Sequence, residues 1–113
     1  MKAYNPRTGK ELSNNVVLAD NILKRMKGLL GKRTMPTGEA LLIKPCISIH
    51  TFFMRFPIDA LFLDKENRVI ATIKNLHPNR ITKLYPKAAS VLELPVGIIE
   101  KTDTRVGDEI GIA

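Results

Sequence analysis

The stretch that decides the fold is IDALFLDKENRVIATI, residues 58–73, in which two apolar runs flank a polar turn. Both runs are rich in residues that favour β-strands. The turn DKEN ends at Asn67, and asparagine adopts the left-handed backbone conformation at low cost. A short loop of this kind joins two antiparallel strands. We therefore predict a β-hairpin over these residues.

Short runs with the same character occur along most of the chain. They are EALLIKP, ISIHTFFM, ASVLELP and the closing RVGDEIGIA, while MKAY and ELSNNVVLA flank the turn NPRTG as a first hairpin. Short strands with turn signals at this spacing favour an antiparallel sandwich or barrel. We therefore expect a mainly β fold, a compact antiparallel β-sandwich or barrel.

One segment has the period of a helix instead. In LADNILKRMKGLLGKR, apolar residues recur every three or four positions, as on one face of an α-helix. We predict a single α-helix over about residues 20–30, packed through Leu23, Met26 and Leu30. It would cover one face or one open end of the β structure.

Length and composition indicate one ordinary globular domain, residues 1–113. The chain is 44% hydrophobic and 26% charged, which is typical of a folded protein rather than a disordered one. Its single cysteine allows no internal disulfide, which suits a reducing compartment. The polar N-terminus has no secretory apolar region, and no run approaches the roughly 20 apolar residues of a membrane span. We expect a cytoplasmic protein without a membrane span.

The net charge of +7 is concentrated in the first third of the chain. Residues 1–37 hold eight cations against Glu11 and Asp20: Lys2, Arg7, Lys10, Lys24, Arg25, Lys27, Lys32 and Arg33. A basic face attracts nucleic acid, anionic lipid or an acidic partner, or only keeps the protein soluble. Nucleic-acid binding is disfavoured because no aromatic residues that could stack on bases lie among these cations.

Cys46 and His50 are four positions apart and invite a catalytic or metal-binding interpretation. On a strand, residues four apart face the same way but lie about 13 Å apart. A thiolate–imidazolium pair needs about 3 Å, and zinc ligands lie closer still. We therefore expect Cys46 as a small buried residue and His50 with satisfied ring nitrogens. Both remain weak metal candidates, and no metal or cofactor is predicted.

Two carboxylates stand among apolar neighbours. Asp59 follows Pro57 at the start of a strand, and Glu93 lies between two leucines in VLELP. If both faces of the sheet are covered, Glu93 is buried and needs His50, Arg55 or backbone N–H groups as partners. If one face is open, Glu93 points to solvent.

The segments GLLGKR, IHTFFMRFPIDALFLD, RVIATI, NLHPNR, SVLELPVG and VGDEI occur in one order. Together they resemble the family named domain of unknown function 192, over about residue 17 to the C-terminus. The resemblance implies a compact, mostly β domain with one helix, and it implies no activity. Its polar signature falls on His50, Thr51, Met54, Asp59, Glu93 and Gly97, with Arg25 and Gly28 on the predicted helix.

The leading functional hypothesis is a small binding or accessory module. Its partner would be a protein, a peptide or a small ligand, and its candidate binding residues are His50, Thr51, Met54, Arg55, Asp59 and Glu93. The alternative is a hydrolase or transferase that uses His50 with Asp59 or Glu93, with Cys46 or a metal as a further participant. The second alternative is nucleic-acid binding through the basic N-terminal third.

Overall fold

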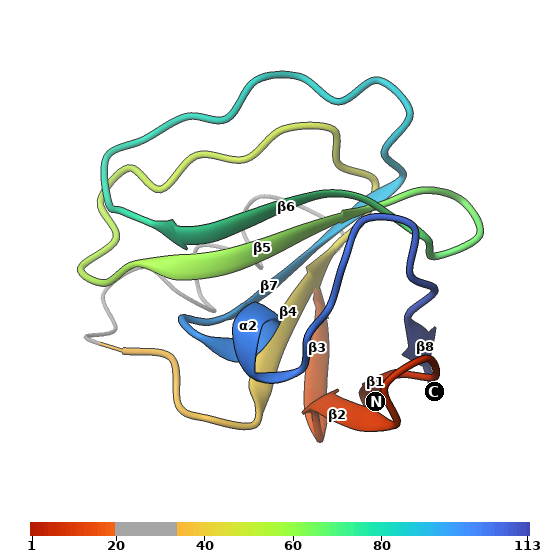
Figure 1. The fold of residues 1–113 in the computed structure, drawn as a ribbon. Coiled ribbons are helices and arrows are strands. Elements are labelled where there is room, and N and C mark those ends of the chain that lie inside the picture. Colours follow the sequence, from red (N-terminus) through yellow and green to blue (C-terminus); the bar gives the residue numbers. More distant parts are fainter. Residues whose placement is uncertain (20–33) are drawn as a thin grey trace.

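The computed structural model describes residues 1–19 and 34–113, and it has a mainly β architecture of two sheets (Figure 1). The two sheets remain separate and pack as a sandwich, so the barrel alternative is not adopted. The helix predicted over about residues 20–30 lies outside the described residues.

The large sheet has five strands in the order β3-β4-β7-β5-β6. The strands are β3 (Asn15–Ala19), β4 (Glu39–Ile43), β7 (Ser90–Pro95), β5 (Ile58–Leu63) and β6 (Val69–Leu76). The predicted hairpin of residues 58–73 is confirmed as the antiparallel pair β5–β6, with Leu63 opposite Val69. Asn67 has φ 59°, so it takes the left-handed conformation expected in the turn.

One pair of strands departs from the antiparallel expectation. Strands β3 and β4 are parallel, with Asn15 opposite Glu39 and Ala19 opposite Ile43. All other strand pairs among the described residues are antiparallel. Parallel neighbours require a long crossover connection, and residues 20–33 lie within the connection between these two strands.

The small sheet has three strands in the order β2-β1-β8: β2 (Lys10–Ser13), β1 (Ala3–Asn5) and β8 (Gly111–Ile112). Strands β1 and β2 form the predicted first hairpin, and Gly9 in its turn has φ 72°. The predicted strand ELSNNVVLA is divided, because the chain passes through Asn14 from β2 in the small sheet to β3 in the large one.

The sequence did not predict the short helix α2 (Ile98–Lys101), which follows β7 directly. It is only one turn long, and Gly97 before it has φ 97°. Within the described ranges 1–19 and 34–113, no helix has the length and apolar character needed to cross a bilayer.

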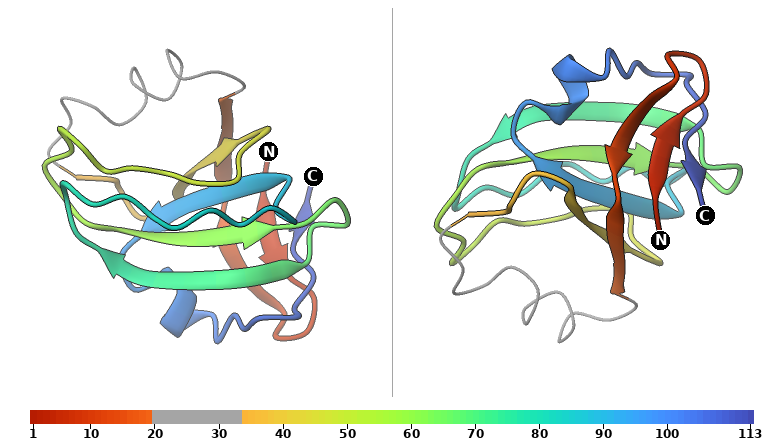
Figure 2. Two further views of the ribbon diagram at one scale, coloured as in Figure 1. Left: turned by 90° about the horizontal axis from the view of Figure 1, so that it is seen from above. Right: turned by 90° about the horizontal axis from the view of Figure 1, so that it is seen from below.

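Both faces of the large sheet are covered (Figure 2). Strands β5 and β7 are therefore buried at every position. One face packs with the small sheet and α2 through Leu61, Leu63, Leu92 and Leu94. The other face carries Ile58, Ala60, Phe62 and Val91. On this second face the sheet is covered by irregular segments, which form the candidate binding surface.

Candidate binding surface

Two irregular segments, residues 44–57 and 77–89, run side by side above the second face of the large sheet (Figures 1 and 2). We call them the loop layer. Backbone hydrogen bonds join them at four places along their length: Cys46 N to Ala89 O, Tyr85 N to Ile47 O, Thr82 N to Ile49 O and Thr51 N to Arg80 O. The layer is therefore one connected structure rather than two independent loops.

The prediction of a strand in ISIHTFFM was wrong. Only His50 forms an isolated bridge, with Ile81, and the neighbouring residues are not in a strand. Side chains take the place of a regular ladder: the Thr82 hydroxyl accepts the Ile49 N–H at 3.1 Å. Ser48 is also within 3.0 Å of the Thr82 hydroxyl. The β-branched residues that suggested a strand serve this irregular pairing instead.

Thr51 is the main connection between the two segments and is fully buried. Its hydroxyl donates to the His77 carbonyl at 2.6 Å and accepts the Arg80 N–H at 2.9 Å. Its own carbonyl accepts the N–H of Asn79 at 3.0 Å. A small side chain that both donates and accepts is required at this position.

Replacing Thr51 with valine should lower the free energy of unfolding by about 2 kcal/mol, because it leaves a buried N–H and a carbonyl without their partner. Urea unfolding followed by circular dichroism measures this difference. The matched control is Thr37→Val at an exposed threonine, which should change stability by less than about 0.5 kcal/mol. Equal effects at both positions would contradict the role assigned to Thr51.

Phe53 occupies a strained turn at the edge of the layer. The Thr51 carbonyl accepts the Met54 N–H at 3.2 Å, which closes a turn in which Phe53 has φ 66°. Glycine or asparagine is usual at such a position, because other side chains crowd the backbone there. The Phe53 side chain is nevertheless 82% exposed. The strain is therefore not offset by burial of the ring.

Changing Phe53 to asparagine should raise the free energy of unfolding by about 1 kcal/mol, since asparagine tolerates the left-handed conformation. Little burial is lost because the ring is largely exposed. Phe52→Asn is the control: Phe52 does not have a positive φ and its ring stacks on His50, so this change should not raise the free energy of unfolding. Thermal or urea unfolding of both variants is the measurement; destabilisation by Phe53→Asn would contradict the expectation.

The outer surface of the loop layer is apolar and cationic. Five large apolar side chains are exposed on it: Ile47, Phe52, Phe53, Ile81 and Leu84. Its two segments also contain five cations, namely Lys44, Arg55, Arg80, Lys83 and Lys87, and no aspartate or glutamate. The sequence interpretation missed Ile81 and Leu84, although the lack of acidic residues in both segments is visible in the sequence.

The candidate residues of the opening motif lie at different depths in the layer. Thr51 and Met54 are buried, His50 is half-buried, and Arg55 is exposed. The His50 ring stacks on Phe52 with centroids 5.2 Å apart. Cys46 is half-buried, and its thiol donates to the Ser48 carbonyl at 3.0 Å.

The argument from strand geometry against a Cys46–His50 pair does not apply, since the segment is not a strand. In the described part of the chain, no three His, Cys, Asp or Glu side chains are grouped as a metal site would require. A role of these two residues as metal ligands remains the weak hypothesis made from the sequence.

Asp59 binds backbone groups on the first face of the large sheet, the face that packs with the small sheet and α2. One carboxylate oxygen accepts the N–H groups of Gly97 at 3.1 Å and Ile99 at 3.0 Å. The other accepts the Asn75 N–H at 2.9 Å. The carboxylate thus holds the first turn of α2 and strand β6 against β5, with its side chain only 1% exposed.

Glu93 is completely buried, as expected if both faces of the sheet are covered. It stands opposite Leu41 on β4 and Ala60 on β5, so its side chain is on the second face, beneath the loop layer. Asp59 stands opposite Leu94 and points to the first face. The sheet therefore separates Asp59 and Glu93, and a single site cannot contain both carboxylates.

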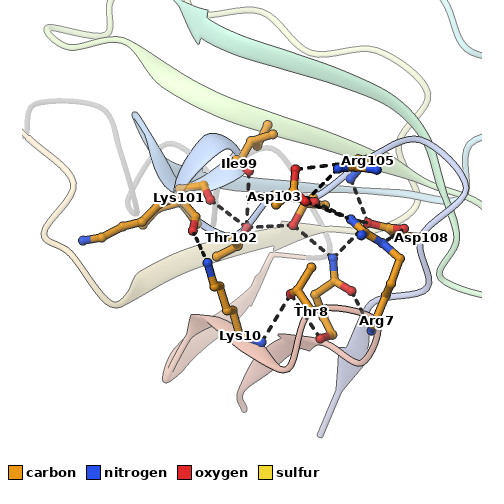
Figure 3. Close-up of polar contacts among 12 residues, drawn as sticks. Arg7, Thr8, Lys10, Ile99, Lys101, Thr102, Asp103, Arg105 and Asp108 are labelled. Carbon is orange, nitrogen blue, oxygen red and sulfur yellow. Dashed lines mark hydrogen bonds and ion pairs between the residues drawn. The ribbon is translucent and has the colours of Figure 1, made fainter.

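A second polar network joins the first hairpin to the C-terminal segment (Figure 3). Asp108 accepts hydrogen bonds from Arg7 Nε at 2.7 Å and from Asn5 Nδ2 at 3.0 Å. It also accepts the Arg105 N–H at 2.8 Å, and Arg7 pairs with Asp103 at 3.8 Å. Arg7 of the basic N-terminal third thus stabilises the fold.

These hydrogen bonds control the ionisation of Asp108. The bonds from Arg7, and then those from Asn5 and the Arg105 N–H, hold the pKa of the Asp108 carboxyl well below its ordinary value, although burial opposes them. The same pair raises the pKa of Arg7, chiefly through its hydrogen bond to Asp108. The network therefore functions as a permanent ion pair at neutral pH.

The two-sheet fold with its loop layer defines a small β-sandwich domain. The chain belongs to the family domain of unknown function 192, described as "Uncharacterized ACR", whose sequence model matches residues 4–112. The resemblance inferred from the motifs is thus confirmed.

Relatives in archaea share the family but have no assigned activity. A UPF0127 protein of Thermococcus sibiricus is 36% identical over 112 residues, which cover 94% of this chain and 71% of that protein. A UPF0127 protein of Pyrococcus furiosus is 33% identical over 111 residues, covering 94% and 93% of the two chains.

Two solved structures are similar in fold. A candidate transcription regulator from Sinorhizobium meliloti has a TM-score of 0.82 at 22% identity, covering 97% of this chain and 89% of that one. A protein of unknown function from Novosphingobium aromaticivorans has a TM-score of 0.75 at 18% identity, covering 99% and 93%. These similarities establish the fold and no activity.

Proposed function

We propose that the protein is a small binding module and that the loop layer is its binding surface. The observation that supports this proposal most strongly is the number of large apolar side chains exposed along the layer, led by Phe53. These side chains expose apolar area that folding would otherwise bury, and large exposed apolar patches mark interaction sites.

The support beneath these side chains is suited to binding. The hydroxyl of Thr51 and the Ser48–Thr82 contact fix the two segments relative to each other. Tyr85 also packs on the buried ring of Phe62, with centroids 4.3 Å apart. A partner would therefore meet a preorganised surface, which reduces the conformational entropy lost on binding.

The strained backbone of Phe53 supports the same proposal. A residue held in a sparsely populated conformation costs free energy and persists where the surroundings impose it, and such residues cluster at functional sites. Here the turn presents an aromatic ring to solvent, and asparagine would adopt the same turn more easily. Selection for binding explains a phenylalanine at this position better than selection for stability does.

Four of the predicted binding residues belong to this surface or its support, namely His50, Thr51, Met54 and Arg55, and Glu93 lies on the sheet face below. Asp59 holds backbone groups on the opposite face, which supports a structural role for that residue. The hydrolase or transferase alternative loses Asp59 as a partner for His50, so binding is the better-supported function.

The proposal is tested by photo-crosslinking from position 53. A benzoylphenylalanine replaces Phe53 in cells that produce the protein, and the same group replaces Val106 as the control. Val106 is also a largely exposed apolar residue, but it lies between α2 and β8. After irradiation, adducts are separated and identified by mass spectrometry.

We expect a defined adduct from position 53 that position 106 does not give, and that is lost when Ile81 and Leu84 are both replaced by asparagine. Equal labelling from both positions, or no adduct from position 53, would overturn the proposal. The adduct is informative whether it contains a protein, a lipid or a nucleic acid, because the proposal concerns the surface used.

A further inference from the structure

We infer that the partner of the loop layer is the surface of an anionic lipid bilayer, an inference that rests on the function proposed above. The layer would lie on the headgroup region, with its exposed apolar side chains inserted and its cations among the phosphates. The protein would be bound peripherally, without crossing the bilayer.

The charge of the layer is complementary to such a surface. Five lysines and arginines lie in residues 44–57 and 77–89 without any carboxylate, whereas the chain as a whole has 11 acidic residues. Each basic side chain close to an anionic leaflet strengthens binding by about fivefold. Asp64 and Glu66 of the β5–β6 turn line the same hollow as Lys44 and Lys87, so the charge argument rests on the other three cations of the layer.

The apolar side chains supply the second component of interfacial binding. Phe53, Ile81 and Leu84 are 82%, 69% and 66% exposed, and they come from both segments of the layer. Aromatic and aliphatic side chains next to basic residues are typical of surfaces that bind at the boundary of headgroups and acyl chains. Two aliphatic residues beside a phenylalanine gain free energy in acyl chains, whereas a nucleic acid would favour aromatic stacking.

The position of the exposed apolar side chains also favours a flat, deformable partner over a peptide. A hollow of about 690 Å³ lies at one end of the layer, lined by Lys44 and Lys87 together with Asp64 and Glu66, and none of the five exposed apolar side chains of the layer lines it. Bound peptides place their anchor side chains in a groove or at a sheet edge. In Figure 1 the layer forms the top of the molecule, away from both termini, where it can approach a plane.

The first test is sedimentation of the full chain with vesicles of phosphatidylcholine, with or without phosphatidylglycerol. We expect binding only to the anionic vesicles, weakened by salt. Phe53→Asn should lower the partition coefficient by about 30-fold, the equivalent of one buried phenylalanine ring. Lys83→Gln should lower it by about fivefold. The matched controls Val106→Asn and Lys101→Gln, outside the layer, should leave it unchanged.

The second test locates the surface that inserts. The chain contains no tryptophan, so Leu84→Trp introduces a single fluorescent reporter, and Val106→Trp is its control. Brominated acyl chains should quench the reporter at position 84 and not the one at position 106. This readout remains valid if a substitution changes stability, because it reports only the bound molecules.

Three results would overturn the inference: no binding to anionic vesicles at low salt, binding that Phe53→Asn leaves unchanged, or equal quenching at both positions. Tighter, Phe53-dependent binding of duplex DNA or of an acidic peptide, added as a competitor, would replace the bilayer with that partner. A protein adduct from position 53 together with failed vesicle binding refutes the bilayer and retains the binding module. Failure of both experiments refutes both proposals.

Discussion

Replacing Asp59 with asparagine should lower the free energy of unfolding by about 3 kcal/mol, one of the two largest effects expected in this protein. The carboxylate is buried and accepts three backbone N–H groups, from Asn75, Gly97 and Ile99. Asparagine has nearly the same volume, but its NH₂ group cannot accept a hydrogen bond. At least one buried N–H then faces another donor, and charged hydrogen bonds are lost.

Urea unfolding gives the size of the effect, and hydrogen exchange at Gly97 and Ile99 gives its location. Asp64→Asn is the control, since Asp64 also accepts backbone N–H groups, but in the exposed β5–β6 turn. Asp64→Asn should lower the free energy of unfolding by no more than about 1 kcal/mol. Unchanged stability of the Asp59 variant, or unchanged exchange at α2, would show that the carboxylate does not hold this helix.

The second large effect depends on pH and involves Asp108. At neutral pH, Asp108→Asn should lower the free energy of unfolding by about 3 kcal/mol, because it removes the charge from a buried carboxylate that accepts hydrogen bonds from Arg7, Asn5 and the Arg105 N–H. The pKa of Asp108 is lowered in the folded protein, whereas the unfolded carboxyl titrates near 3.9. Its stabilisation is therefore complete above about pH 5 and declines as the unfolded chain takes up protons at lower pH.

The measurement is urea unfolding of the wild type and the variant between neutral pH and about pH 2.5, below the pKa of an unfolded aspartate. Their difference in free energy should be constant above about pH 5 and shrink below it. Glu109→Gln, at the adjacent exposed carboxylate, should show no comparable difference. A difference for Asp108→Asn that stays constant into the acid range would contradict the ionic role.

Much of the β architecture could be predicted from the sequence because local signals agree with the fold. The runs around Asn67 form the expected hairpin, and the left-handed asparagine fixes its turn. VLELP is a strand that is buried on both faces, as the apolar neighbours of Glu93 allowed. The parallel pairing of β3 and β4 could not be predicted, since strand direction depends on the connection and not on the strand residues.

The loop layer could not be predicted for a different reason. Ile47, Ile49 and Thr51 are typical strand residues, but side chains replace part of the backbone pairing. The Thr82 hydroxyl accepts the Ile49 N–H, and the Thr51 hydroxyl accepts the Arg80 N–H. The exposed turn at Phe53 also contradicts the local preference of phenylalanine for strands. Such contacts join residues about thirty positions apart, and periodicity along the chain carries no information about them.

The role of Asp59 was missed because its partner is a helix of one turn. Four residues are too few to produce a helical period, so α2 gave no signal. The carboxylate therefore resembled a candidate catalytic group, whereas its oxygens bind the N–H groups of Gly97 and Ile99.

The order of the strands has a consequence for how the chain folds as it is synthesised. Strand β7 lies between β4 and β5 in the large sheet, although the ribosome makes it after both of them. In the small sheet, β1 pairs with β8, so Ala3 cannot pair on this side until Ile112 has been synthesised. Both sheets therefore expose unpaired strand edges during translation, and such edges are prone to aggregation. The nascent chain should depend on chaperones until residue 112 has left the exit tunnel, and only then can it fold as a single cooperative unit.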